Sequence, residues 1–206
     1  MPPHTELPPD EARAQNETGN AARTAAAAVL VHRNLSPDEA RWLHEELKTT
    51  PNILGYTVPE LLRFREVIVA ESGGAFAGAC LSKDLLFGWT DIAALYVLPD
   101  FRQRGIGALL YGAAFARAEE RRRHIFTLSR SPEVIRLMER FGLNLTRSVW
   151  RAPLAFHLHM NRHMSSAYRL KESVRKASAL PKNSQSFVAG RKRHARQNNN
   201  NTLAGA

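Results

Sequence analysis

The sequence has little cysteine, no long hydrophobic run, and few acidic residues towards its C-terminal end. Cys80 is the single cysteine of 206 residues, so an internal disulfide cannot form, which fits a reducing compartment. The longest apolar run near the N-terminus, Ala25 to Val31, is far short of the roughly 20 residues that a membrane span requires. Residues 1–20 contain no basic segment followed by an apolar one. We therefore expect no secretory signal, no membrane partner and a cytoplasmic location.

The positive charge is concentrated in the last quarter of the chain. The net charge is +10, and residues 157–206 hold ten Lys and Arg against the single acid Glu172. Within this region Arg191 to Arg196 form a cationic cluster that could contact a polyanion in a salt-sensitive way. Aromatic residues for stacking on bases are few there. A solvated extension is the simpler interpretation, and an accessory contact with RNA, a ribosome or another acidic partner stays open.

Composition divides the chain into three parts. Residues 1–24 are rich in Pro, Asn and charge without periodicity, which predicts a disordered arm. Residues 25–153 carry the periodic apolar patterns of a single folded domain. Residues 154–206 predict a basic, largely disordered tail, with a basic helix over 156–178 and a low-complexity end from 180 onward.

Residues 25–153 alternate between strand-like and helix-like patterns. Ser36 to Glu39 have the pattern of a capping box with proline in the first turn, which predicts a helix that stops before Pro51. Ser72 to Gly74 predict a hairpin turn. This order predicts an α/β fold with a mixed, mostly antiparallel central sheet flanked by helices. The expected strands are 25–33, 66–71, 75–82, 89–97, 124–129 and 145–150. The expected helices begin at 37, 59, 107 and 132. The one that begins at 59 is either a short helix or an irregular connection.

The stretch from Val97 to Leu110 predicts a strand, a short basic turn and a helix. Pro99 cannot donate to a sheet ladder, so the strand should end there. Gly105 and Gly107 stand at the helix start. Free N–H groups and the positive end of the helix dipole meet at such a turn, which makes it an anion site best suited to phosphates.

Three phosphate-binding motifs place glycines in a turn of this kind. A dinucleotide fingerprint needs a third small residue where Leu110 stands. A P-loop needs the string G-x-x-x-x-G-K-[ST], which is absent. The remaining pattern is R-x-x-G-x-G, formed by Arg102, Gly105 and Gly107. The alternative is that the glycines only form a tight turn, that the arginines are solvated, and that no ligand binds here.

This motif resembles the signature of the GNAT superfamily of N-acetyltransferases. The matching string is V-x-P-x-x-R-x-x-G-I-G-x-x-L, which runs from Val97 to Leu110. The hairpin from Val69 to Leu81 and the corner Phe141-Gly142-Leu143 are similar to parts of the same family. The resemblance covers roughly residues 25–151 and implies a GNAT-like domain that uses acetyl-CoA as its acetyl donor.

The resemblance also implies how acetyl-CoA binds. Backbone N–H groups of the turn would hold the pyrophosphate, and two arginines would add charge-assisted hydrogen bonds. The edge of the preceding strand would pair with the pantetheine amides, and an N–H there would hold the thioester oxygen. Ser131 stands where the family often has an asparagine near the cofactor, although a helix cap is the simpler interpretation. The predicted cofactor-binding residues are Leu95, Tyr96, Val97, Arg102, Gln103, Arg104, Gly105, Ile106, Gly107, Ala108 and Ser131.

Two positions bear on proton transfer. Asp91 falls where histone-acetyltransferase-like members of the family place a catalytic glutamate, so we take it as the candidate general base; a structural residue at the strand start is the alternative. Met138 stands where the family often has a tyrosine that protonates the CoA thiolate. Water or another residue would replace that donor. The hydroxyls of Tyr96 and Tyr111 are available, and Tyr111 better fits a packing role.

The remaining reactive side chains indicate no metal and no covalent intermediate. His157, His159 and His163 lack supporting carboxylates or cysteines, so we expect no metal site. Cys80 fits a small core residue.

The expected function is therefore acetyl transfer from acetyl-CoA to a primary amine by direct attack. An acetyl-CoA-binding sensor or interaction module is one alternative, and acetylation of an RNA-linked amine is another. A homodimer is left open, and the acceptor cannot be read from the sequence.

Overall fold

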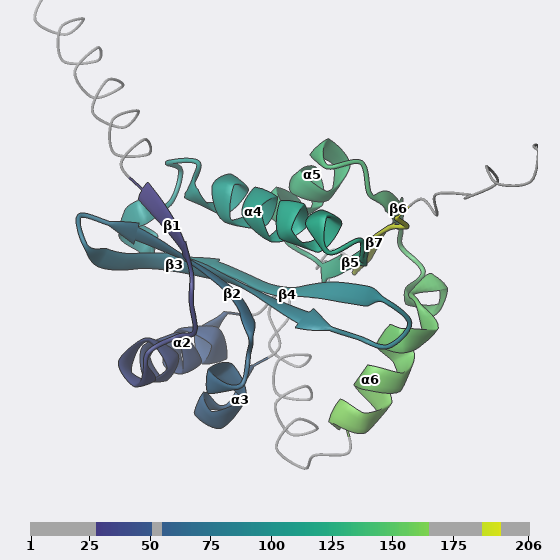
Figure 1. The fold of residues 1–206 in the computed structure, drawn as a ribbon, viewed down its shortest axis with the longest axis horizontal. Helices are drawn as coiled ribbons and strands as arrows, with labels where there is room; N and C mark the ends of the chain where they lie inside the picture. Colours follow the sequence, from purple (N-terminus) through teal and green to yellow (C-terminus); the bar gives the residue numbers. More distant parts are fainter. Residues whose placement is uncertain (1–27, 51–54, 165–186, 195–206) are drawn as a thin grey trace, which may run out of the picture. The chain divides into compact units, whose positions relative to one another are not determined.

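The computed structural model describes residues 28–50, 55–164 and 187–194 (Figure 1). Its strands are hydrogen-bonded in the order β1-β2-β3-β4-β5-β7-β6. The β4–β5 pair is parallel, whereas β1–β2, β2–β3, β5–β7 and β6–β7 are antiparallel. The predicted mixed, mostly antiparallel sheet is confirmed. The strands are β1 (Ala28–His32), β2 (Glu66–Ser72), β3 (Ala75–Asp84), β4 (Trp89–Val97), β5 (His124–Ser129), β6 (Asn144–Thr146) and β7 (Val188–Lys192).

The helices accompany these strands in the predicted order. They are α2 (Pro37–Thr49), α3 (Val58–Leu62), α4 (Ile106–Glu120), α5 (Pro132–Arg140) and α6 (Leu154–Met164), with the 3₁₀ turns η1 (Pro99–Phe101) and η2 (Val149–Arg151). None of the helices in the described ranges has the length and apolar character to cross a membrane. The chain forms two compact units: residues up to 83 with 92–114, and residues 84–91 with those from 115 onward. Strand β4 begins in the second unit and continues into the first.

In the first unit, the start of α2 is fixed by its own sequence. Ser36 Oγ accepts from the backbone N–H of Glu39 (3.2 Å), and the Glu39 carboxylate accepts from the N–H of Ser36 (2.7 Å). This is the predicted capping box, with Pro37 in the first turn. The helix buries Ala40, Leu43 and Leu47, which recur at helical spacing on one face.

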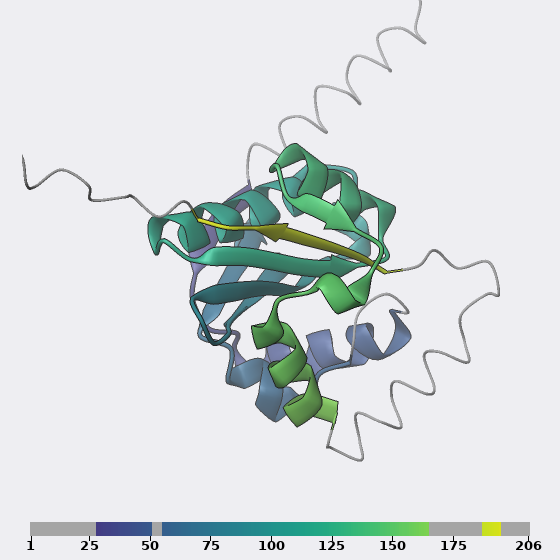
Figure 2. The ribbon, with the colours of Figure 1, turned by 90° about the vertical axis from the view of Figure 1, so that its right-hand side faces the viewer.

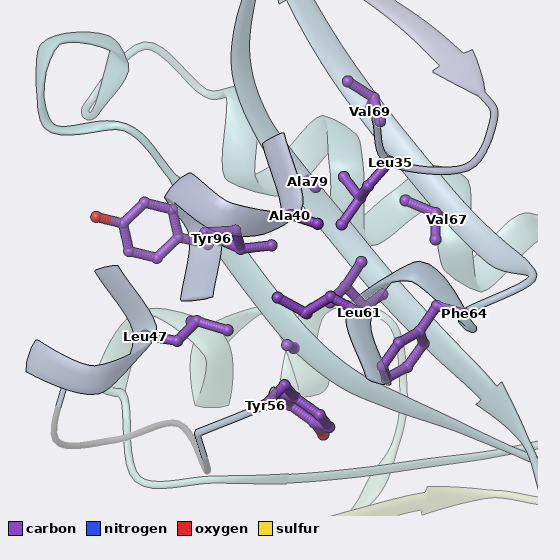
Figure 3. Packing of buried hydrophobic residues seen from close by; sticks show 13 residues of the cluster. Leu35, Ala40, Leu47, Tyr56, Leu61, Phe64, Val67, Val69, Ala79 and Tyr96 are labelled. Carbon is purple, nitrogen blue, oxygen red and sulfur yellow. The ribbon is translucent and has the colours of Figure 1, made fainter. Parts of the chain in front are cut away.

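That face of α2 packs with α3 on the strands of the first unit. Figure 3 shows the cluster, in which side chains of α2 and α3 meet residues of β2, β3 and β4. Tyr96 is the member nearest the end of β4, and its hydroxyl oxygen points away from the cluster. The buried members are Leu35, Ala40, Leu43, Leu47, Tyr56, Leu61, Phe64, Val67, Val69, Ala79, Leu81, Ala94 and Tyr96.

Arg33 joins three elements at the edge of the same unit. Its guanidinium contacts the carboxylate of Glu39 at the start of α2 (2.6 Å) and that of Glu71 on β2 (2.8 Å). The hydrogen bond from Arg33 lowers the pKa of Glu39, against the opposing effect of partial burial. The residue after β1 is thereby tied both to the helix that follows it and to its partner strand.

In the second unit, β7 lies between β5 and β6, shown in yellow in Figure 2. Ala189 is buried and faces Leu128 across the β5 ladder and Thr146 across the β6 ladder. Gly190 is closely covered, because a Cβ built on it would come within 2.7 Å of Met138 Sδ. The apolar cluster of this unit comprises Leu85, Trp89, Phe126, Ala152, Ala155, Phe156 and Ala189.

The structure corrects the predicted disordered end of the chain in one stretch, because residues 188–192 form β7. Residues 154–164 form α6, which starts directly after Pro153 and overlaps the start of the basic helix predicted over 156–178. The sequence V-A-G-R-K is short and half polar, and its strand conformation depends on the two neighbouring ladders rather than on local preference. The predicted arm and the rest of the predicted tail lie outside the described residues, at 1–27, 165–186 and 195–206.

The predicted last strand, 145–150, is also wrong in its bounds. Strand β6 ends at Thr146, where Thr146 Oγ1 accepts from the N–H of Ser148 (3.2 Å) and the chain turns. The η2 turn follows, and its Trp150 is 90% exposed. The hydrogen bond between the Ser148 backbone and the Thr146 side chain therefore ends the strand, although apolar residues continue beyond it.

Candidate functional site

The first unit contains the predicted strand, basic turn and helix. Strand β4 ends at Val97, and η1 follows at once because Pro99 cannot continue the ladder. Gln103 and Gly105 then adopt left-handed backbone conformations, with φ of 60° and 78°. Glycine adopts this conformation without strain, whereas Gln103 does not, so the turn is held by its surroundings. A Cβ on Gly107 would lie 3.8 Å from Val97 Cγ2, so the start of α4 lies against the end of β4.

The turn presents unused backbone donors at the start of α4. The N–H groups of Ala108 and Leu109 both donate to the carbonyl of Gly105 (3.0 and 3.1 Å). Ala108 was predicted to offer its N–H to a ligand, and in the structure this N–H is occupied within the turn. The N–H groups of residues 103–107 donate to no backbone carbonyl in the described ranges. The first turn of α4 has no acidic residue either, so the positive helix end faces no side-chain anion of its own.

Two arginines flank these donors without an acidic partner among the described residues. Arg102 donates from Nε to the Val97 carbonyl (3.1 Å) and from Nη2 to the Tyr96 hydroxyl (3.3 Å). The guanidinium of Arg104 lies 5.5 Å from the ring centroid of Phe101. Their charges are therefore available to an anion at the turn, as the sequence predicts.

The β4 residues before the turn face opposite ways. Tyr96 is buried, whereas Leu95 and Val97 are half-buried, and both approach the position of Gly107. The Tyr96 hydroxyl donates to Glu46 Oε2 on α2 (2.5 Å). Burial and this carboxylate raise the pKa of Tyr96 to about 12, which makes it a weak proton donor near neutral pH. Glu46 was missed at the sequence level, because its contact with β4 arises only when the chain folds.

Asp91 and Ser131 belong to the second unit. Asp91 is buried on β4, opposite Phe126 of β5 in the parallel register. Ser131 caps α5: its Oγ accepts from the N–H of Val134 (3.5 Å) and donates to Glu133 (2.5 Å). This hydrogen bond lowers the pKa of Glu133. The capping role of Ser131 is thus visible, while its contact with a cofactor and the role of Asp91 as a base stay predictions.

Met138 is fully buried beneath β7, where its sulfur would meet any Cβ at Gly190. A thioether has no proton to donate, so Met138 fills the core and cannot supply the proton that the sequence resemblance assigns to a tyrosine at this position. Tyr111 is fully buried as well, in agreement with the packing role predicted for it.

The other candidate side chains, Cys80 and His157, make packing contacts within the fold. Burial raises the pKa of the Cys80 thiol to about 12, as for a core cysteine. His157 stacks on Trp150 with ring centroids 6.2 Å apart. Among the described residues, no group of three or more His, Cys, Asp or Glu is placed to hold a metal ion.

A mixed sheet whose fourth strand leads through a basic, glycine-containing turn into a helix is the arrangement that the sequence resemblance predicts. The sequence model of the acetyltransferase (GNAT) family matches residues 29–143. The chain belongs to this family, as the sequence motif predicts.

Solved structures with the same fold include proteins bound to coenzyme A. N-acetylglutamate synthase from Neisseria gonorrhoeae, complexed with coenzyme A and N-acetyl-glutamate, has a TM-score of 0.56 and 14% identity. The alignment covers 80% of this chain but 35% of the synthase, so this chain spans about a third of its length. Rv2747 from Mycobacterium tuberculosis, in complex with CoA, has a TM-score of 0.56 and 18% identity over 78% of this chain and 97% of that one.

A third similar structure is the ribosomal-protein-S18-alanine N-acetyltransferase from Escherichia coli. It has a TM-score of 0.52 and 12% identity over 83% of this chain and 97% of that one. At these identities the likeness establishes the fold. A comparison with curated protein sequences finds no match.

Proposed function

We propose that the protein is an N-acetyltransferase that binds acetyl-CoA at the turn between β4 and α4 and acetylates a primary amine. The observation that carries this proposal is the turn itself. Its N–H groups at 103–107 have no backbone acceptor, and Arg102 and Arg104 have no acidic partner in the described ranges. Together they offer several donors and two positive charges to a pyrophosphate.

The donor's thioester would lie along the end of β4, where a backbone N–H can stabilise the developing oxyanion. The neutral amine nitrogen attacks the carbonyl carbon, and the tetrahedral intermediate collapses by breaking the C–S bond. The electron pair of that bond leaves on sulfur as CoA thiolate, and the nitrogen loses a proton. We assign this proton to Asp91, through a water because the aspartate side chain is short. The thiolate, with a thiol pKa near 8.5, leaves without a tyrosine donor and takes a proton from water.

A matched pair of glycine variants tests the cofactor site. Gly105→Glu places a carboxylate in the turn and should abolish acetyl-CoA binding, measured by calorimetry and by the shift in melting temperature. Gly74→Glu is the control, because Gly74 lies at the β2–β3 hairpin with the same φ of 78° and nothing within 4 Å of its Cβ. Both variants carry the same backbone strain. Wild-type protein that shows no melting shift with acetyl-CoA would contradict the proposal.

The acceptor is sought with a CoA-release screen across polyamines, aminoglycosides, peptides and aminoacyl-tRNA. With a suitable acceptor, Asp91→Asn should lower kcat by about 100-fold or more while CoA binding is unchanged. An unchanged kcat would exclude Asp91 as the base.

The buried Met138 favours a second candidate function, a sensor that binds acetyl-CoA without turnover. It predicts CoA binding in calorimetry and no thiol release with any amine class. The third alternative, an RNA-linked acceptor docked by the cationic cluster, is less favoured. Lys192 of that cluster pairs with Glu119 (2.7 Å), and Arg191 donates to the carbonyl of Arg151 (3.2 Å), so part of its charge stabilises the second unit.

A further inference from the structure

Three side chains from separate parts of the first unit form one chain of hydrogen bonds that ends at the turn. Arg102 Nη2 donates to Tyr96 Oη (3.3 Å), and Tyr96 Oη donates to Glu46 Oε2 (2.5 Å). Glu46 lies on α2, Tyr96 on β4, and Arg102 after η1. The core helix α2 is therefore connected to the residue that begins the R-x-x-G-x-G motif.

The carboxylate of Glu46 determines which way the Tyr96 hydroxyl points. An ionised carboxylate only accepts hydrogen bonds and a guanidinium only donates them, whereas a phenol does both. With its proton directed at Glu46, the Tyr96 oxygen presents its lone pairs to Arg102. Without an acceptor at position 46, the hydroxyl proton is free to turn towards the Arg102 N–H groups, and that contact is lost.

The Tyr96 ring that carries this hydroxyl is itself fixed in place. It is buried, and the ring of Trp42 meets it edge-on with centroids 5.7 Å apart. The Arg102 guanidinium also lies 5.6 Å from the Tyr96 ring centroid. The oxygen that receives Arg102 therefore has a defined position.

Two of the three guanidinium nitrogens of Arg102 are hydrogen-bonded. Its Nε is bound to the Val97 carbonyl and its Nη2 to Tyr96, while Nη1 has no hydrogen-bond partner in the part of the chain that the structure describes. A guanidinium fixed through two nitrogens loses little further freedom when the third binds a phosphate oxygen.

We propose that Glu46 and Tyr96 are positioning residues that orient Arg102 towards the pyrophosphate of acetyl-CoA. This inference rests on the proposed function. Neither side chain is assigned a contact with pantetheine or the thioester, for which the sequence resemblance assigns only backbone groups of β4. Loss of either side chain should therefore weaken binding of the donor through its pyrophosphate and leave the acetyl-bearing end unaffected.

The experiment compares CoA with pantetheine, which lacks the pyrophosphate, as ligands of the full-length protein. Tyr96→Phe and Glu46→Ala should each raise the Kd of CoA about five-fold, and leave that of pantetheine unchanged. Glu46→Gln should stay within two-fold of wild type, because its amide oxygen still accepts from Tyr96. Glu45→Ala is the control on the neighbouring exposed position of α2, where Glu45 pairs with Lys48, and should have no effect.

A double-mutant cycle separates positioning from general loosening of the fold. Arg102→Ala should weaken CoA binding, and Tyr96→Phe added to it should weaken binding no further. Equal losses for CoA and pantetheine, or additive effects of the Tyr96 and Arg102 variants, would overturn the inference. Tyr96→Phe that binds CoA as wild type does would overturn it too. A wild-type protein that binds no CoA would instead overturn the proposed function.

Discussion

Gly78 of β3 lies directly against the carbonyl of Tyr96, so closely that a Cβ on Gly78 would stand 2.5 Å from that oxygen and 3.0 Å from Val97 Cα. Both contacts are with backbone, which cannot rotate away as a side chain can. The part of β4 that precedes the turn from Arg102 to Gly107 therefore depends on a glycine in the neighbouring strand.

Gly78→Ala should destabilise the protein by about 1–3 kcal/mol, as expected for overpacking in a core, and should weaken CoA binding by displacing β4. Chemical denaturation and calorimetry measure the two effects. Gly74→Ala is the comparison: its Cβ meets nothing within 4 Å, so its cost is limited to roughly 1–2 kcal/mol for the left-handed backbone, with CoA binding retained. Normal CoA binding by Gly78→Ala would show that β4 tolerates the displacement.

The ion pairs of Arg33 should make stability depend on pH. The pKa of Glu39 is lowered in the folded state, so its contribution is present above the ordinary carboxyl pKa of about 4.5 and is lost as pH falls through the lower folded value. Arg33→Met should cost about 2 kcal/mol at neutral pH and should flatten the acid limb of the stability curve.

Arg41→Met is the control for Arg33→Met. Arg41 pairs with Asp38 on the exposed side of α2, and its loss should change the unfolding free energy by less than about 0.5 kcal/mol. Urea denaturation from pH 3 to pH 7 measures both variants. Parallel pH curves for wild type and Arg33→Met would contradict the role of this network.

Cys80 should be unreactive in the native protein. It is fully buried and the pKa of its thiol is raised to about 12, so little thiolate forms near neutral pH. A disulfide-exchange reagent should label it only after denaturant is added. Cys80→Ala should keep acetyl transfer, because the proposed direct attack needs no acyl-enzyme. Loss of kcat with an intact fold would indicate a covalent step.

Two truncations of the C-terminal region should differ in stability. A chain ending after His194 keeps β7 and should unfold at nearly the wild-type temperature. A chain ending before Phe187 loses the strand between β5 and β6, together with the cation–π contact of Arg130 over Phe187 (3.8 Å). We expect its second unit to lose cooperative unfolding in calorimetry. Equal stability of the two truncations would show that β7 is dispensable.

The parts of the fold that the sequence predicts are those determined by neighbouring residues. The Ser36–Glu39 capping box, the hairpin at Gly73 and Gly74, and the turn from Arg102 to Gly107 each depend on a few consecutive residues, and each is found where expected. Such local preferences are visible without knowledge of the fold.

The features that escape prediction depend on contacts distant in sequence. Strand β7 is stabilised by ladders to β5 and β6, and the Glu46 to Tyr96 hydrogen bond joins α2 to β4. The Ala108 N–H is a different case, because the carbonyl that it binds, that of Gly105, is only three residues away. Composition alone describes residues 188–192 as tail, because their burial comes entirely from their partners.

The late position of β7 in the sequence also determines which unit can fold first. The first unit uses no residue beyond 114, so all its strands are available while the rest of the chain is still being synthesised. Strand β6, by contrast, is paired with residues 189–191, which are synthesised well after it. Because domains fold as their segments emerge from the ribosome, the turn between β4 and α4 can form early, whereas the second unit must wait for β7 and exposes the edge of β5 until then.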